Sequence, residues 1–200
     1  LRCIAGLHQP KTGLIHCAGE TWLDTDRRVT VATHHRRIGM VFQHYALFPH
    51  LSALDNVVQA MGEAPPAERR SRAIDLLDRL HLQGLAHRRP HQLSGGQQQR
   101  VAVARALARE PKVLLLDEPF SAVDRTTREA LYGELAELRD ELRMPVLLVT
   151  HDLDEATMLA DRLCILSVGR TLQVGTPDQV LTAPTTPEVA RLVGMRNLFS

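Results

Sequence analysis

An apolar run that ends in two acids constrains the fold of this 200-residue chain more than any other feature. Residues 113–116 are Val-Leu-Leu-Leu, and Asp117 and Glu118 follow directly. A strand that is apolar on both faces is typical of parallel sheets covered by helices. The pattern therefore predicts a buried parallel strand that delivers two adjacent carboxylates at its end.

Predicted strands and helices alternate along the chain after Pro111. This alternation predicts an α/β fold with a parallel sheet and right-handed crossovers. An antiparallel hairpin around Ala18-Gly19 is predicted near the start of the chain. The other predicted elements are strands at Val29–Val31, Ile38–Phe42, Val146–Thr150 and Leu163–Leu166, and helices at Thr126–Leu142 and Leu153–Ala160.

Between these parts, residues 52–109 have a helical pattern that Pro65-Pro66 and Arg89-Pro90 interrupt. An apolar stripe with near-helical spacing supports this prediction, and it consists of Ile74, Leu77, Leu80 and Leu82. We expect a helical subdomain at 52–109 within a single domain that spans residues 1–200.

A glycine pair with a preceding serine opens the last predicted helix of this segment. The residues are Ser94, Gly95, Gly96 and Gln97. Backbone N–H groups at a helix start, with the helix dipole behind them, form an anion site, and a serine hydroxyl adds a donor. For the glycine pair alone, a turn that caps a helix is the ordinary alternative.

Polar residues follow the predicted parallel strands at the sheet edge where α/β folds bind ligands. Asp117 and Glu118 end one strand, Gln43 follows another, and His151 follows a third. Carboxylate oxygens suit Mg²⁺, and a second carboxylate suits general-base chemistry. Imidazole can donate to an anionic oxygen. Taken singly, the two acids are also consistent with a polar turn at the end of a strand, Gln43 carries no signal, and His151 is typical of a surface loop.

Together, the Ser94–Gln97 segment and the Val113–Glu118 segment resemble the signature and Walker B motifs of ATP-binding-cassette (ABC) ATPases. The resemblance covers essentially the whole chain. It implies a P-loop NTPase-like ABC ATPase core with a parallel sheet, a small antiparallel β subdomain and a helical signature subdomain. The implied ligands are ATP and Mg²⁺.

The same resemblance implies the role of each candidate residue. Asp117 and Gln43 bind Mg²⁺, Glu118 polarises the attacking water, and His151 is the switch histidine, with Gln43 also counted as catalytic. The segment Ser121–Asp124 is similar to the D-loop, whose Asp124 acts across a dimer. Ser94, Gly95, Gly96 and Gln97 contact the γ-phosphate of ATP held by a second subunit, in a head-to-tail pair.

Two further segments, His44–Leu51 and Gly175–Pro177, resemble import-type ABC ATPases. Asp152–Ala156 and Leu192–Asn197 favour the molybdate, sulfate or ferric-iron uptake group. The implied partners are transmembrane permease subunits, a second ATPase subunit and, indirectly, a periplasmic or extracellular substrate-binding protein. The implied location is the cytoplasmic face of the plasma (inner) membrane.

One family feature is missing, because no G-x-x-x-x-G-K-[ST] phosphate loop occurs in the sequence. The chain also starts and ends within structural patterns, at Leu1 and Ser200. We expect a chain truncated at both ends, lacking the N-terminal strand and phosphate loop and inactive by itself. The alternative is a catalytically silent module that docks on transporter subunits.

Composition narrows the remaining function classes. The formal net charge of +1 gives no electrostatic case for a nucleic-acid partner. Three scattered cysteines argue against a disulfide framework and are typical of a reducing compartment. No apolar run reaches the roughly 18 to 20 residues that a membrane span requires.

Overall fold

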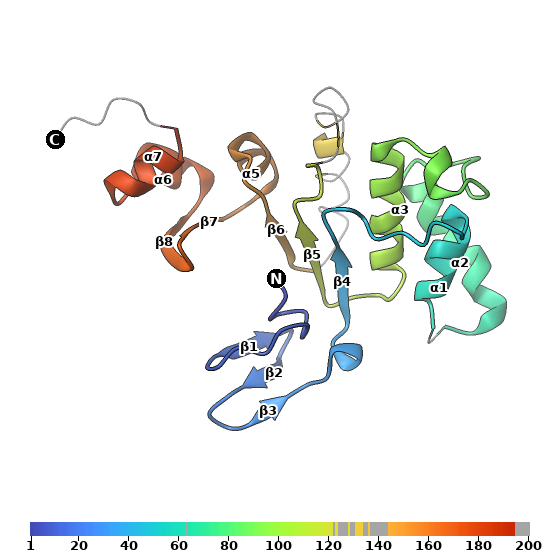
Figure 1. The fold of residues 1–200 in the computed structure, drawn as a ribbon, viewed down its shortest axis with the longest axis horizontal. Coiled ribbons are helices and arrows are strands. Elements are labelled where there is room, and N and C mark those ends of the chain that lie inside the picture. The colour runs from blue at the N-terminus through green and yellow to red at the C-terminus, as the bar shows by residue number, and fades with distance from the viewer. Residues whose placement is uncertain are drawn as a thin grey trace. The chain divides into compact units, whose positions relative to one another are not determined.

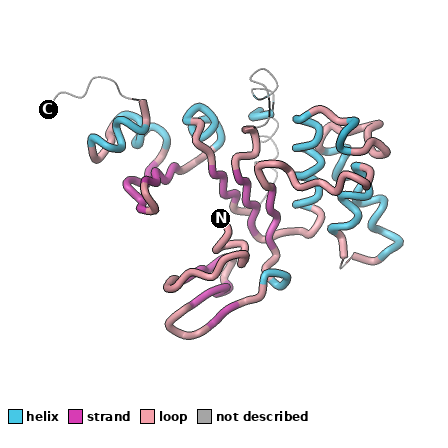
Figure 2. The backbone as a smooth tube through the Cα atoms, viewed as in Figure 1, coloured by secondary structure: helices cyan, strands magenta, loops and turns pink. Residues whose placement is uncertain are grey.

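The computed structural model describes residues 1–62, 64–121, 123, 128, 131–133, 136 and 144–194. The chain forms two compact units, Leu1–Val149 and Thr150–Ser200. Figure 2 shows that helices, strands and loops occur in both units. Each unit is described separately below.

A parallel sheet forms the centre of the first unit (Figure 1). Its described strands are β4 (Ile38–Val41), β5 (Val113–Asp117) and β6 (Val146–Val149), in the order β4-β5-β6. Val41 pairs with Leu116, and Leu116 pairs with Leu148. Residues 113–116 are all buried. The predicted buried strand and the α/β fold class are therefore confirmed.

Two strand predictions were wrong in part. The strand at Val146–Thr150 was expected to be buried, but Leu147 and Val149 are 41% and 39% exposed in β6. Within the described residues β6 pairs with β5 alone, which leaves its other edge uncovered. The strand at Leu163–Leu166 was expected in the parallel sheet. It instead forms β7 (Leu163–Ser167), which pairs antiparallel with β8 (Arg170–Gly175).

The tight turn between these strands explains the second difference. Val168 and Gly169 both have positive φ, 47° and 74°. Positive φ at both central residues is the requirement of a type I′ hairpin turn. The second unit also contains helices α5 (Leu153–Leu159), α6 (Pro177–Thr182) and α7 (Pro187–Leu192). Leu163 packs in its core with Val180, Val189 and Val193.

The predicted N-terminal hairpin is confirmed. β1 (Leu14–Cys17) pairs antiparallel with β2 (Glu20–Asp24), which also pairs with β3 (Val29–Thr30). Ala18 and Gly19 form the turn with φ of 48° and 80°. A short 3₁₀ helix, Thr33–His35, follows β3. Trp22 of β2 is 1% exposed and belongs to one hydrophobic cluster with Leu115 of β5, so this small sheet packs on the parallel sheet.

Helices occupy the region predicted to be helical, and Figure 1 shows α3 beside β4 with α1 and α2 beyond it. They are α1 (Ala53–Ala60), α2 (Pro66–Arg79), a 3₁₀ turn (Pro90–Gln92) and α3 (Gly95–Leu107). Val101 and Ala104 of α3 are fully buried in the main core with Leu114.

One residue of the predicted apolar stripe does not face the core. Ile74 is 40% exposed, whereas Ala73 and Leu77, four residues apart, are the buried positions of α2. Most of the predicted helix Thr126–Leu142 lies outside the described residues. Among the helices that the structure describes, none has the length and apolarity that crossing a membrane requires.

Candidate functional site

The ends of β4 and β5 bring a predicted pair of site residues together. Because Val41 pairs with Leu116, the chain leaving β4 lies beside the chain leaving β5. The Gln43 side chain donates a hydrogen bond from Nε2 to Glu118 Oε2 at 3.1 Å, across 75 residues of sequence. Asp117 is the last residue of β5, and both acids are half-buried.

The backbone of Glu118 is fixed by its neighbours. Its N–H donates to the carbonyl of Val149 at 2.9 Å, which extends the β5–β6 pairing by one residue. Its carbonyl accepts hydrogen bonds from the Ser121 N–H at 3.2 Å and the Ser121 hydroxyl at 2.9 Å. Glu118 itself has a φ of 45°, in the left-handed region. The site thus places a carboxylate beside an amide at a rigid sheet edge.

The glycine pair begins α3 as predicted. Ser94 is the N-cap residue, and its hydroxyl oxygen accepts from the Gln97 N–H at 3.3 Å. The Gln97 side chain accepts in return from the Ser94 N–H at 3.0 Å, which completes a capping box. The first N–H groups of a helix have no partner within it. The start of α3 therefore offers the Gly95 and Gly96 amides and the Ser94 O–H to an anion.

The remaining predicted residues are not tested by this geometry. His151 is exposed and lies in the second unit, immediately before Asp152, the N-cap residue of α5. Asp124 lies outside the described residues. In the described part of the chain, no group of three or more His, Cys, Asp and Glu side chains could hold a metal ion alone.

Asn56 is a residue of this region that sequence analysis missed. Its side chain is fully buried in α1 and accepts from the Phe48 N–H at 2.8 Å. It also donates to three backbone carbonyls, those of Phe48, Leu51 and Ser52, at 2.9 to 3.3 Å. A polar residue between apolar Leu54 and Val57 was the available signal. The loop after Gln43 is thereby fixed at its far end.

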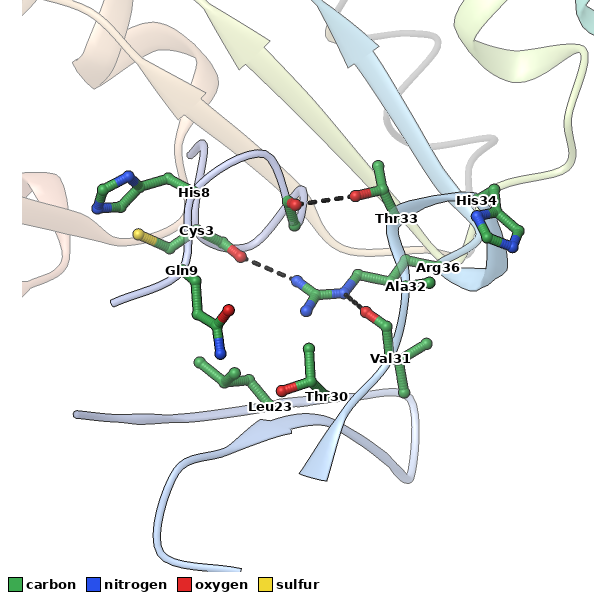
Figure 3. A pocket seen from close by; sticks show the side chains of 11 residues that line it. Cys3, His8, Gln9, Leu23, Thr30, Val31, Ala32, Thr33, His34 and Arg36 are labelled. Atoms are coloured by element: carbon green, nitrogen blue, oxygen red, sulfur yellow. Dashed lines mark hydrogen bonds between the residues drawn. The ribbon is translucent and has the colours of Figure 1, made fainter. Parts of the chain in front are cut away.

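A cavity of about 320 Å³ lies elsewhere in the first unit (Figure 3). Arg36 points into it and donates to the carbonyls of Cys3, Ile4 and Val31, each at 2.9 Å, and of Trp22 at 3.2 Å. Burial lowers the pKa of Arg36. None of the predicted site residues lines this cavity. We interpret Arg36 as a structural tie between the N-terminal turn and the small sheet.

Comparisons with known proteins identify relatives of this chain. The family model described as ABC transporter matches residues 1–121, which include Gln43, the Ser94–Gln97 segment and both acids. The chain is 49% identical to sulfate/thiosulfate import ATP-binding protein CysA 1 of Rhizobium meliloti (strain 1021), covering 100% of this chain and 58% of that protein. It is 48% identical to CysA of Methylococcus capsulatus, covering 100% and 57%.

A solved structure also resembles this chain. The ATP-binding cassette MJ0796, determined as a dimer bound to ADP and Pi, matches with a TM-score of 0.71 and 35% identity. The match covers 88% of this chain and 78% of that one. The chain spans somewhat over half the length of its curated relatives, 58% and 57% for the two named above. Since the family model matches more than half of the chain, at residues 1–121, the protein belongs to the ABC transporter family.

Proposed function

We propose that the protein binds and hydrolyses ATP as the nucleotide-binding subunit of an importer. The observation that carries the proposal is the Gln43–Glu118 hydrogen bond of 3.1 Å at the carboxyl end of the parallel strands. Ligands of α/β folds bind at this edge. The relatives are import ATP-binding proteins, and the structural neighbour holds ADP and Pi.

The chemistry follows from the groups at the sheet edge. Water attacks the γ-phosphorus, the bond to the β–γ bridging oxygen breaks, and the water proton passes to the Glu118 carboxylate. Proton transfer to a positioned side chain contributes typically about 10²- to 10⁴-fold in rate. Gln43 orients the Glu118 oxygen through its amide, and the carboxamide is free to contact the attacking water when that hydrogen bond opens.

The residues at the site fit Mg²⁺, which supplies charge neutralisation at the phosphates when bound. Magnesium usually combines one or two carboxylates with substrate phosphate oxygens and water, rather than occupying an all-protein cage. The half-buried Asp117 at the end of β5 is such a carboxylate. We propose Asp117 as its protein ligand, with the Gln43 carbonyl oxygen as a second candidate.

The anion site at the start of α3 completes the proposal. Ser94, Gly95, Gly96 and Gln97 would receive the γ-phosphate of ATP bound by a second subunit, while Asp124 and His151 act at the shared interface and the phosphate. Because one chain then supplies only part of each site, the active form is a head-to-tail pair. The structural neighbour was also determined as a dimer, which supports a pair of subunits.

The relatives also suggest the transported substrate and the partners. Both named relatives are sulfate/thiosulfate import proteins. We propose sulfate or a similar oxyanion as the cargo. The partners are permease subunits in the membrane and, indirectly, a substrate-binding protein. The subunit would then lie at the cytoplasmic face of the membrane.

The test is the Glu118→Gln variant of the protein as its gene encodes it. We expect phosphate release from Mg-ATP to fall about 10²- to 10⁴-fold, because the amide cannot accept the proton. The matched control is Glu110→Gln, whose exposed carboxylate pairs with Arg37 and Arg72 on the surface. Surface ion pairs contribute little, so the control should keep wild-type activity.

Two results would contradict the proposal. Equal activity of Glu118→Gln and wild type would refute Glu118 as the general base. No ATP hydrolysis by the wild-type protein in the presence of the permease and a second subunit would refute its assignment as an ATPase. A silent docking module would then be the better interpretation.

A further inference from the structure

We propose that Arg105 is a positioning residue that fastens the Gln43 loop to the signature helix α3. The Gln43 loop is defined here as residues 42–51, between β4 and α1. This inference rests on the proposed function, because it assigns Arg105 a part in setting Gln43 for hydrolysis. Nothing in the sequence pattern pointed to Arg105, which lies within an ordinary helical stretch.

The contacts of Arg105 carry the proposal. Its Nη1 donates to the Ala46 carbonyl at 2.7 Å, and its Nη2 donates to the Tyr45 carbonyl at 2.8 Å. Its guanidinium carbon lies 5.7 Å from the centroid of the Phe48 ring. A planar guanidinium fork suits two adjacent acceptors and an aromatic face. One side chain of α3 therefore contacts residues at three positions of the loop.

The loop has the conformation that this clamp requires. Tyr45 and Ala46 are consecutive residues with positive φ, 58° and 47°. Residues with a β-carbon adopt this region at an energetic cost and keep it only where their surroundings impose it. The paired bonds to Arg105 supply a partner for both the Tyr45 and the Ala46 carbonyl.

Asn56 holds the other end of the same loop. Its buried amide satisfies both the N–H and the carbonyl of Phe48. The loop is thus tied to α3 through residues 45 and 46 and to α1 through residue 48. Only its beginning, with exposed Gln43, is left to reach Glu118.

The position of Arg105 on its helix gives the clamp a functional meaning. Arg105 lies in the last turn of α3, and Ser94 caps the first turn of the same helix. Close-packed protein interiors have low compressibility and transmit strain. A displacement of α3 when Ser94 meets a phosphate is therefore passed to the Gln43 loop. Burial also lowers the pKa of Arg105, as expected for a guanidinium enclosed between loop and helix.

The first experiment measures the loop directly, without ATP. Arg105→Lys keeps the charge but removes the fork and the stacking surface. We expect the hydrogen-bonded amides of Tyr45, Ala46 and Phe48 to exchange hydrogen about ten-fold faster, which corresponds to a loss of about 1.4 kcal/mol. The amides of α3 should be unchanged. Arg109→Lys is the matched control, because within the described residues Arg109 donates a single long hydrogen bond, to the His34 carbonyl at 3.5 Å.

The second experiment is a double-mutant cycle on ATP hydrolysis. We expect Arg105→Lys to lower kcat about 10- to 100-fold with little change in KM, as for a misplaced catalytic group. In a Gln43→Ala background, Arg105→Lys should cause almost no further loss. Gln43 is exposed, so its truncation leaves the fold intact.

The two experiments separate the failure of this inference from the failure of the proposed function. Hydrogen exchange in the Gln43 loop of Arg105→Lys at the wild-type rate would refute the proposed role of Arg105. So would a double variant whose loss in kcat is the product of the losses caused by Arg105→Lys and Gln43→Ala alone. Absence of hydrolysis in the wild-type protein would instead refute the ATPase. The exchange result would still decide whether Arg105 holds the loop.

Discussion

Glu118 has a backbone conformation that costs a residue with a β-carbon about 1–3 kcal/mol, with a φ of 45°. The cost is offset by hydrogen bonds from its own N–H to Val149 and from Ser121 to its carbonyl. Strain of this kind is retained where the neighbours determine the conformation. The sheet edge and the following turn, rather than any preference of glutamate, therefore set the direction of the proposed general base.

Tyr45 gives a prediction at the same scale. Its side chain is 5% exposed, and its hydroxyl is one of the buried polar atoms that have no hydrogen-bond partner in the described structure. Burial raises its pKa. Above about pH 10 the unfolded chain loses the phenol proton while the folded protein keeps it. The free energy of unfolding therefore falls as the pH rises from about 10 towards the folded-state pKa.

The Tyr45→Phe variant should lack this alkaline loss. Near pH 8 it should be as stable as the wild type or slightly more stable, because an unpartnered buried hydroxyl is removed. Its advantage should grow as the pH rises above about 10. Urea unfolding of both proteins at several pH values measures the difference. A difference that stays constant across this range would contradict burial of the phenol.

That Gln43 and Glu118 lie at one sheet edge could be predicted from sequence, whereas the partners of Asn56 and Arg105 could not. Gln43 and Glu118 each follow a strand, and neighbouring parallel strands end at one edge. The partners of Asn56 and Arg105 are backbone carbonyls of a loop, which leave no pattern in the sequence. Their roles depend on how segments up to 60 residues apart meet in three dimensions.

At the scale of the elements, strands were predicted correctly where their own sequence determines their surroundings. β5 was correctly predicted because its apolar run requires cover on both faces. The burial of β6 was overestimated, because exposure at an edge depends on which strands pair with it rather than on its own composition. β7 has the same apolar character, but the Val168-Gly169 turn directs it into a hairpin. The apolar pattern of a strand does not determine which strand it pairs with.

Gly39 provides a prediction for the contact between β4 and α3. A β-carbon at this buried position would lie 3.0 Å from the Ala106 carbonyl oxygen, 3.0 Å from Leu114 and 3.1 Å from Pro111. The nearest neighbour is helix backbone, which has little freedom to move. We expect Gly39→Ala to lower the free energy of unfolding by about 1–3 kcal/mol, as for overpacked cores.

Gly62→Ala is the control for this prediction. Nothing lies within 4 Å of a β-carbon at Gly62. The substitution should therefore be neutral, or stabilising by about 0.4–1 kcal/mol through the unfolded chain. Urea unfolding of the two variants tests the packing of α3 on the sheet. Equal effects of the two substitutions would show that β4 and α3 are not in close contact.

At the scale of the whole molecule, the two chemical parts of the proposed site lie on different elements. The carboxylates end β5 of the sheet, and the anion-binding amides begin α3. In the family that the sequence resembles, these parts serve different ATP molecules. A monomer would then contain two half-sites, and ATP would act as the link between two copies. Hydrolysis would release that link.

This arrangement predicts an ATP-dependent dimer that depends on the serine of one helix cap. In the protein as its gene encodes it, Glu118→Gln should bind Mg-ATP and double its mass in light scattering, because slowed hydrolysis leaves the linking nucleotide intact. Adding Ser94→Arg should keep the protein monomeric, since the larger side chain fills the anion site. Adding Thr176→Arg instead should leave the dimer, although Thr176 also caps a helix through a capping box with Gln179. Ser94→Arg and Thr176→Arg each remove a helix cap worth about 1 kcal/mol. The two variants therefore differ only in which helix loses its cap. A dimer that survives Ser94→Arg would place the phosphate away from α3.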